Sequence, residues 1–483
     1  MISTLKEKLK GMSVEVKSAT VYTLSSVFSR GLAIISMPIF TRIMSSADIG
    51  VVNLYTSWYS MISIVSTLAL TSGGYSLAMK EFDGERDAYE SSVLTLTTIM
   101  ALVIGGGLVL LSPWASPAIG LSPRLIILMT FGLLVMPAWD FWNLRQRFEY
   151  KYKLSFVLSV GSAVLATVAS VGAVLLVSSQ PESNVNLSEA RLAANYLVVY
   201  GLSAVMWILL MIRGKRFYDR RFWKFSLNLS LPLIGYSIAS QVLNVSDRVM
   251  ISSMVGDAET GVYGVLYSAS SIALFLWTAI NASFIPYLFR NIDAEGHQGI
   301  RKASTLLLAV FALVSILISW LGPEIIKVLA TDEYLAAITL MPPIAAGVFL
   351  TSISNLYSNI LVYYKKTKYI MFAAIAAAVV NVALNLVAIP LFGYGAAAYT
   401  TLASYIILAV SQRVWATKAC RERGRMEPIY EDGKLGALSV ACIAATMAGI
   451  ILYQTNVLRY VTCAVLLVLV AFLSVKAKSS RES

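Results

Sequence analysis

The stretch "LSSVFSRGLAIISMPIF", from Leu24 to Phe40, is almost wholly apolar, yet it carries the always-charged Arg30 in its middle. The whole chain shares this apolar character, since 58% of its 483 residues are hydrophobic, only 13% are charged and the mean hydropathy is +0.73. A soluble chain carries about a quarter charged residues. Apolar runs of about 20 residues, long enough to cross a bilayer as a helix, recur from end to end. The sequence therefore predicts an all-α, polytopic membrane protein.

Polar breaks divide the chain into fourteen predicted membrane spans. With the N-terminus inside, 30 of the 38 Lys and Arg residues fall in inner breaks and only 5 in outer breaks. Basic residues collect on the cytoplasmic side of membrane proteins, so this asymmetry predicts that both termini are cytoplasmic. The predicted spans are 18–40, 51–79, 91–112, 124–143, 154–178, 191–212, 228–252, 261–289, 303–322, 338–362, 369–391, 395–417, 435–453 and 457–475.

Two segments in the first half have echoes in the second half. The stretch "SSADIGVVNLYTS" (Ser45–Ser57) resembles "GDAETGVYGVLYS" (Gly256–Ser268), with glycine, valine and serine at matching places. The stretch "RQRFEYKYKLSF" (Arg145–Phe156) resembles "LVYYKKTKYIMF" (Leu361–Phe372) at a similar separation. Six spans separate the copies, so both copies start on the same side of the membrane. A parallel repeat about an axis along the membrane normal follows.

The repeat divides the chain into lobes. We expect two six-helix lobes related by a pseudo-twofold axis, a basic cytoplasmic linker between them and two additional C-terminal helices. Such repeats hold a substrate between the lobes and alternate its access by rocking. The predicted boundaries are 1–212 for the first lobe, 213–227 for the linker, 228–418 for the second lobe, and 419–483 for a cytoplasmic loop with the last two helices.

The sequence lacks the residue patterns of several kinds of site, namely disulfide frameworks, zinc sites and nucleotide-binding loops. The chain has one His (His297) and three scattered Cys, which do not form a disulfide framework or a zinc site. It also lacks the G-x-x-x-x-G-K-[ST] phosphate loop, because Gly214-Lys215 and Gly433-Lys434 have neither the upstream Gly nor the following Ser or Thr. No outer break is long enough for the catalytic loop of a glycan polymerase or glycosyltransferase. We expect a protein that is not an enzyme, with no cofactor and no nucleic-acid partner.

Three stretches resemble the Wzx-type oligosaccharide flippases, a polysaccharide transporter family in the superfamily of lipid II flippases and MATE exporters. They are "SRGLAIISMPIFTRIMSSADIGVVNLY" (Ser29–Tyr55), "DRVMISSMVGDAETGVYGVLYSAS" (Asp247–Ser270) and "NILVYYKKTKYIMFAAIAAAVVNVALNLVAIPLFGYGAAAYTTLASY" (Asn359–Tyr405). Wzx-type proteins are usually drawn with twelve helices, and fourteen are found among relatives.

The resemblance implies that the protein flips an oligosaccharide on an undecaprenyl pyrophosphate carrier. The direction is from the inner to the outer leaflet of the bacterial plasma membrane, for O-antigen, capsule or exopolysaccharide synthesis. Partners of this class are membrane lipids, a polymerase and a chain-length protein. A lipid II flippase and a MATE-like multidrug or cation antiporter are the alternatives. The deep Arg30 favours an anionic substrate over the cationic drugs of an antiporter.

Arg30 lies 13 residues past Lys17, or about 20 Å into the bilayer at ~1.5 Å per residue. A charge at that depth costs at least ~2.5–3.5 kcal/mol, so it needs a wet cavity or a partner. The planar guanidinium donates two parallel hydrogen bonds, which suits a pyrophosphate. The alternative is that Arg30 donates to backbone carbonyls or reaches the outer interface beside Arg42.

Asp247 and Arg248 lie in the outer half of the seventh predicted span, the counterpart of the first. Adjacent helical residues point about 100° apart, so we expect that the two do not simply pair with each other. One interpretation is an interfacial charge pair with separate neighbours. The other makes Arg248 an anion contact of the second lobe and Asp247 a proton or cation site.

Two pairs of asparagines also interrupt apolar spans. Asn355 and Asn359 share one helix face, and Asn381 and Asn385 share another, because each pair is four residues apart. Asparagine hydrogen-bonds across membrane helices and so holds them together. The other interpretation is that these faces bind the sugars of the substrate.

Overall fold

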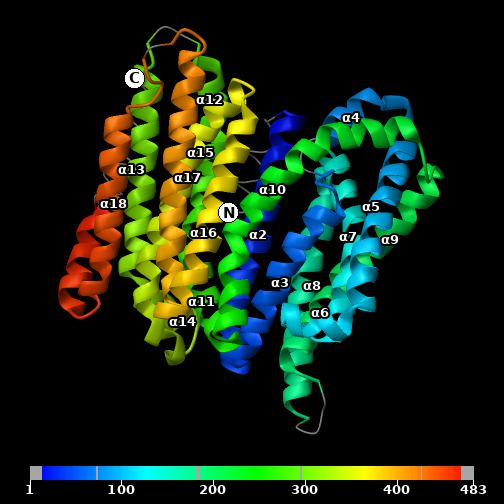
Figure 1. Ribbon diagram of the computed structural model, residues 1–483, viewed down its shortest axis with the longest axis horizontal. Helices are drawn as coiled ribbons and strands as arrows, with labels where there is room; N and C mark the ends of the chain where they lie inside the picture. Colours follow the sequence, from blue (N-terminus) through cyan, green and yellow to red (C-terminus); the bar gives the residue numbers. More distant parts are fainter. Residues whose placement is uncertain (1–12, 72–73, 181–184, 294–295, 426, 469–483) are drawn as a thin grey trace. The chain divides into compact units, whose positions relative to one another are not determined.

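The computed structural model describes residues 13–71, 74–180, 185–293, 296–425 and 427–468 (Figure 1). In that part of the chain every regular element is a helix. Contacts between residues divide the chain into two compact units, residues 1–241 and 242–483. The prediction of an all-α polytopic membrane protein is confirmed.

The first unit is built on three helices that pack against one another, α5, α7 and α9 (Figure 1). On their flank, α8 packs against both α9 and α2. The helices are α2 (Val14–Ile43), α3 (Ser46–Ser66), α4 (Tyr75–Glu81), α5 (Arg86–Leu110), α6 (Ser112–Ile119), α7 (Pro123–Phe148), α8 (Tyr152–Ser178) and α9 (Leu187–Gly214), with a 3₁₀ turn η1 at Asp83–Glu85. Helix α10 (Arg220–Met254) begins in this unit and ends in the second.

In the second unit α15 packs against both α13 and α17, as α7 packs against α5 and α9 in the first, and α16 packs against α17 as α8 packs against α9. An additional helix, α18, packs against α13 and α15 (Figure 1). The helices are α11 (Asp257–Ser270), α12 (Ala273–Asn291), α13 (Gln298–Trp320), α14 (Gly322–Leu329), α15 (Met341–Tyr363), α16 (Thr367–Phe392), α17 (Ala396–Arg421) and α18 (Asp432–Leu452), with a 3₁₀ turn η2 at Asp332–Leu340 and an apolar helix at Asn456–Val468.

Small local features repeat along with the long helices. A short helix of eight residues follows a long one in each unit: α6 follows α5, and α14 follows α13. Each short helix has Leu before it and a proline in its first turn. A proline is favoured there because the first helical N–H needs no partner within the helix. The stretches "RQRFEYKYKLSF" and "LVYYKKTKYIMF" each contain one left-handed residue, at neighbouring places: Tyr150 is the sixth letter of the first and Lys365 the fifth of the second, with φ of 56° and 55°. In both turns the next residue, Lys151 or Lys366, donates its N–H to the carbonyl five residues back, as in a Schellman motif.

Each predicted span overlaps one or two helices of the described residues, although residues 72–73 and 469–475 lie outside them. By length and composition, nine helices of the described chain are apolar enough to cross a membrane, or ten if the bent pair α11 and α12 is one span. The predicted spans that miss this criterion lie on α3, α10, α17 and the last helix. α10 and α17 are long enough, but their buried polar residues lower their hydropathy.

Part of the segment that we expect to form the linker, 213–227, packs into the first unit. Phe222 is fully buried, the Trp223 Nε1 donates to the Ser92 carbonyl at 2.9 Å, and the Arg216 N–H donates to the Ser91 hydroxyl at 3.3 Å. Burial of the Phe222 ring removes its apolar surface from water, whereas Phe217 and Tyr218 stay exposed. The two compact units accordingly divide inside α10, at residue 241, and not within 213–227.

Candidate functional site

A polar cavity of about 460 Å³ lies in the first unit, between α2, α7 and α8. Ser29 lines it, and Arg30 is the next residue of α2; the Arg30 side chain is outside the described part of the structure. Hydroxyl groups give the wall its polarity, and Arg147, stacked 5.1 Å from the Tyr22 ring, supplies a cation. The lining residues are Tyr22, Ser25, Ser26, Ser29, Thr71, Trp139, Asp140, Asn143, Leu144, Arg147, Ser155 and Ser159.

Asp140 is the carboxylate of this cavity. It also lines a second cavity of about 170 Å³, together with Tyr59, Ser63 and Thr67. No ion pair or hydrogen bond joins the Asp140 side chain to another described residue. The structure places Asp140, a charged residue within α7, on two polar cavities of the first unit. Among the described residues no three His, Cys, Asp or Glu side chains are grouped to hold a metal ion.

A buried ionic cluster lies where α5 meets the end of α7. Glu90 is fully buried, and its Oε2 accepts a hydrogen bond from the Arg145 Nη1 at 2.6 Å. Arg145 also contacts Asp87, and the Tyr75 hydroxyl contacts the other Glu90 oxygen. A buried carboxylate requires such partners, because removing an unpaired charge from water costs several kcal/mol. The cluster ties α4, α5 and α7 together at this end of the unit.

Glu149 extends the cluster into the turn between α7 and α8. Partial burial alone would raise the pKa of its carboxyl group, but hydrogen bonds from Lys151 and Arg145 outweigh this and lower the pKa below its usual value. The Arg145 Nε donates to Glu149 at 2.9 Å, and the Lys151 Nζ lies 2.6 Å from it. The left-handed turn is therefore held by charge as well as by backbone bonds.

In the second unit, Asp247 and Arg248 form a buried ionic site on α10. The Arg248 Nη1 lies 3.9 Å from the Asp247 Oδ1, which also accepts the Arg248 backbone N–H at 2.8 Å. The expectation that adjacent residues do not pair is wrong, because the long Arg248 side chain folds back to donate to the Asn244 carbonyl at 2.9 Å. Asp247 is 1% exposed and its Oδ2 accepts no hydrogen bond from the described residues.

Tyrosines surround this ionic site. The Arg248 guanidinium lies 4.3 Å from the centre of the Tyr267 ring, a cation–π contact. The Tyr267 hydroxyl lies 3.4 Å from that of Tyr405, which in turn donates to the Asn244 Oδ1 at 3.1 Å. α10, α11 and α17 thus each contribute polar groups to one place in the second unit.

A tyrosine pair joins the corresponding helices of the first unit. The Tyr55 hydroxyl on α3 lies 3.2 Å from the Tyr200 hydroxyl on α9, just as Tyr267 on α11 meets Tyr405 on α17. In both units a glycine of the neighbouring helix makes room for the second ring. A Cβ on Gly132 would lie 2.3 Å from the Tyr200 ring, and one on Gly347 would lie 3.2 Å from the Tyr405 ring. Tyr59 and Tyr196 extend the aromatic group of the first unit.

The asparagines lie in two separate places. Asn381 and Asn385 are fully buried, and the Asn385 Nδ2 donates to the Asn381 Oδ1 at 3.2 Å. Ser246 on α10 donates to the same Asn381 oxygen at 2.9 Å, and Thr400 and Thr401 on α17 complete the network. These contacts link three helices in the way that amides hold membrane helices together.

The other pair lies on α15. The Asn359 Nδ2 donates to the Asn281 Oδ1 on α12 at 2.9 Å. Asn355 is partly exposed, and its side chain hydrogen-bonds to no described residue. The structure therefore brings Asn381, Asn385 and the segment around Asp247 together through Ser246, and it leaves Asn355 apart from them.

Sequence reasoning misses the tyrosine groups, Asp140 and the Glu90 cluster. A signal for the tyrosines exists, since Tyr55 and Tyr59, Tyr196 and Tyr200, and Tyr263 and Tyr267 are each four residues apart and so share a helix face. Glu90 and Asp140 are isolated acids near span ends, which the sequence alone does not distinguish from surface charges.

Comparison with protein-family models gives two matches. The model described as "Polysaccharide biosynthesis protein" matches residues 16–292, which is more than half of the chain. The chain belongs to the polysaccharide biosynthesis protein family. The family of MATE proteins matches residues 232–387. The match to the polysaccharide biosynthesis family covers all the helices of the first unit and continues to the end of α12.

Solved structures share the fold of this family member. The lipid II flippase MurJ, in an inward closed conformation, superposes with a TM-score of 0.68 at 14% identity, over 95% of this chain and 99% of that one. An inward-facing MATE multidrug transporter of the MOP superfamily gives 0.63 at 11% identity, over 83% and 96%. A MOP superfamily transporter from Pyrococcus furiosus, whose title reports reverse polarity of its binding pocket, gives 0.52 at 12% identity, over 87% and 98%. No curated protein matches the chain.

Proposed function

We propose that this protein is a flippase that moves an oligosaccharide repeat unit, linked to undecaprenyl pyrophosphate, from the inner to the outer leaflet of the bacterial plasma membrane. It works by alternating access of two six-helix lobes, with both termini in the cytoplasm. The product feeds O-antigen, capsule or exopolysaccharide synthesis, beside a polymerase and a chain-length protein. Transport has no catalytic residue in this proposal.

The observation that carries the proposal is the family membership of the first 292 residues. The shared fold supports it, because a flippase for lipid II aligns with 95% of this chain. Family and fold together favour transport of a lipid-linked glycan over a multidrug function.

The substrate contacts are part of the same proposal. Arg30 on α2 and Arg248 on α10 bind the diphosphate, since guanidinium groups donate paired hydrogen bonds to phosphate oxygens. Asp247 is the ion-coupling group, and its unbonded Oδ2 is an acceptor for a proton or a cation. Asn355, partly exposed on α15, is the sugar contact of its pair. Asn359, Asn381 and Asn385 hold the helices that carry these groups.

One observation favours the alternative of a MATE-like cation antiporter. Asp140 lines two polar cavities of the first unit and is not paired with a described cation, and such a carboxylate suits a cationic ligand. The two functions predict different phenotypes for a strain that lacks the protein. A flippase strain loses surface glycan and accumulates the lipid-linked repeat unit on the inner leaflet. An antiporter strain keeps its glycan and becomes sensitive to cationic drugs.

The first experiment therefore measures surface glycan, lipid-linked intermediates and drug sensitivity in a deletion strain. Loss of glycan with accumulation of intermediate supports the proposal. Unchanged glycan with raised drug sensitivity selects the antiporter. Loss of cell-wall synthesis, with lipid II accumulating in place of the repeat unit, selects a lipid II flippase.

The second experiment complements the deletion with Arg30 variants at matched membrane levels. Arg30→Ala should insert and fold, because it removes a charge from the bilayer, but it should abolish export. Arg30→Lys should retain part of the activity, because the charge remains while the paired hydrogen bonds are lost. Arg42→Ala is the matched control, since Arg42 lies in the last turn of the same helix and donates to the Pro38 carbonyl at 2.8 Å. Full export by Arg30→Ala would remove Arg30 from the site.

A further inference from the structure

A cavity of the second unit lies between α15, the end of α17 and the start of α18. Its volume is about 630 Å³, and four cations and two carboxylates line it, namely Arg413, Lys418, Arg421, Arg425, Glu427 and Asp432. None of these residues belongs to the site proposed above. The cavity therefore needs an explanation of its own.

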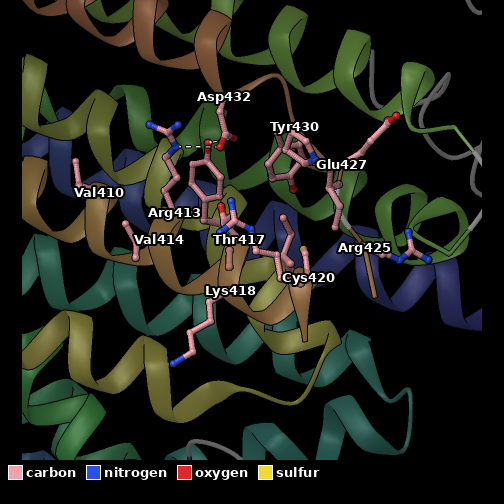
Figure 2. Close-up of a pocket in the computed structure, with 16 residues that line it drawn as sticks. Val410, Arg413, Val414, Thr417, Lys418, Cys420, Arg425, Glu427, Tyr430 and Asp432 are labelled. Carbon is pink, nitrogen blue, oxygen red and sulfur yellow. Dashed lines mark hydrogen bonds and ion pairs between the residues drawn. The ribbon is translucent and has the colours of Figure 1, made fainter. Parts of the chain in front are cut away.

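Both carboxylates already have a cation. The Arg413 Nε donates to the Asp432 Oδ2 at 3.0 Å, and the Tyr357 hydroxyl donates to the other Asp432 oxygen at 2.7 Å (Figure 2). The Glu427 carboxylate pairs at 3.0 Å with Arg301, a residue of α13. Neither acid is free to neutralise a further cation of the cavity.

Two cations of the cavity, Lys418 and Arg421, form no ion pair with a described acid. Arg425 is held elsewhere, by Asp293 at 2.8 Å and by the His297 Nε2 at 2.8 Å. Lys418 lies over the Trp415 ring at 5.3 Å, and Figure 2 shows its side chain directed away from Asp432. The Arg421 side chain is exposed and makes no ion pair or hydrogen bond with a described residue. Glu422, which attracts Lys418, already pairs with Lys366 at 2.6 Å. Lys418 and Arg421 thus give the cavity a positive end.

The same face of α17 is aliphatic one and two turns earlier. Val410 and Val414 line the cavity and are 53% and 58% exposed (Figure 2). Val410, Val414, Lys418 and Arg421 follow a spacing of three or four residues, so they form one stripe along the helix. The stripe runs from two exposed valines to two cations over about 16 Å, at ~1.5 Å per residue. In a membrane helix this order matches the acyl chain and headgroup of a lipid.

We propose that this cavity binds the headgroup of an anionic membrane phospholipid. The phosphodiester contacts Lys418 and Arg421, and an acyl chain lies along Val410 and Val414. Basic pockets between membrane helices are a recognised way to hold such headgroups. A phospholipid fits better than a free phosphate, because only a lipid also covers the exposed valines. The site is separate from substrate transport and stands whether or not the chain is a flippase.

The test uses the purified full-length protein in detergent, titrated with phosphatidylglycerol or phosphatidylcholine, with bound lipid counted by native mass spectrometry. The wild-type protein should prefer phosphatidylglycerol. Each basic residue near an anionic lipid contributes about 1 kcal/mol, so Lys418→Gln with Arg421→Gln should weaken phosphatidylglycerol binding about 30-fold and leave phosphatidylcholine binding unchanged. Val414→Asp should weaken both lipids, because it places a charge against the acyl chain.

The matched control is Lys368→Gln with Arg423→Gln. These two residues are exposed at the same end of the second unit and carry the same charge, but they do not line the cavity. The control should change binding less than twofold. An equal loss in the control would show a general effect of net charge and would overturn the proposal. Displacement of phosphatidylglycerol by inorganic phosphate alone, or much tighter binding of undecaprenyl phosphate, would also overturn it.

Discussion

Gly132 sets the distance between α7 and α9 in the first unit. The Tyr200 ring occupies the space of its missing side chain, with ring atoms 2.3 Å from an ideal Cβ. Gly132→Ala should therefore force the helices apart or displace the Tyr200 hydroxyl from Tyr55. Overpacking of this kind costs about 1–3 kcal/mol. We expect a lower midpoint for thermal unfolding of the detergent-solubilised protein.

Gly201 is the matched control, since it neighbours Tyr200 and nothing lies within 4 Å of its Cβ position. Gly201→Ala should stabilise α9 slightly, because alanine is the better helix former by about 1 kcal/mol. Adding Tyr200→Leu should reduce the effect of Gly132→Ala, as a double-mutant cycle would measure. Equal effects of the two glycine substitutions would contradict the packing that the structure describes.

Arg248 compensates a carboxylate that is almost completely buried. Arg248→Ala leaves Asp247 without its cation, and breaking a buried pair from one side costs about 3–5 kcal/mol. We expect a large loss of thermal stability, and a much smaller loss when Asp247→Asn accompanies Arg248→Gln. A stable Arg248→Ala protein would mean that Asp247 is neutral in the membrane, which would favour its role as a proton site.

The turn between α15 and α16 includes a left-handed residue, Lys365, whose substitution by glycine can be tested. Lys365 has φ of 55°, a conformation that costs a residue with a Cβ about 1–2 kcal/mol. Lys365→Gly should stabilise the protein, by roughly 0.5–1 kcal/mol after the greater flexibility of glycine in the unfolded chain is allowed for. Thermal unfolding measures the change.

Lys368→Gly provides the comparison, because it removes the same charge from the first turns of α16. Glycine there lowers helix stability by up to about 1 kcal/mol relative to a good helix former. The two substitutions should therefore have opposite signs. If both destabilised the protein, the backbone at Lys365 would not be left-handed in the membrane.

The helices could be located from the sequence where a long apolar run is bounded by polar residues. Long apolar runs such as Tyr152–Ser178 gave their ends within a few residues. The break between α3 and α4, the bent pair α11 and α12, and the burial of Phe222 could not be predicted, because tertiary contacts determine them. Arg220, Arg221 and Lys224 lie close to Phe222 in the sequence, and only packing against the first unit makes it a core residue.

Individual site residues were harder to predict than elements. A charge in an apolar run, such as Asp247, is visible in the sequence, but its partner depends on how the Arg248 side chain folds. The environments of Glu90 and Asp140 were equally hard to predict from the sequence. Both are acids near a span end, yet the first is paired and buried and the second lines a cavity.

For the whole molecule, the orientation in the membrane is the prediction that most needs a test. Single cysteines at Lys153, Arg221 and Arg423 should be protected from a membrane-impermeant maleimide in intact cells, and cysteines at Gln180 and Thr455 should be labelled. All five positions are exposed, so accessibility reports the side of the membrane. The native Cys420, Cys442 and Cys463 are buried and should give a low background. Labelling at Arg221 from outside would refute the parallel arrangement of the repeats.

The tyrosine pairs bear on how the two halves of the chain diverged. If a duplicated segment had kept the spacing of 211 that relates Gly50 to Gly261 (50 to 261), Tyr55, Gly132 and Tyr200 would correspond to Leu266, Pro343 and Ser411. The same contacts are instead made by Tyr267, Gly347 and Tyr405, at spacings of 212, 215 and 205 (55 to 267, 132 to 347, 200 to 405). A sequence alignment of the two halves without gaps would therefore not match these residues. A comparison of the helix pairs that are joined by two tyrosine hydroxyl groups does match them.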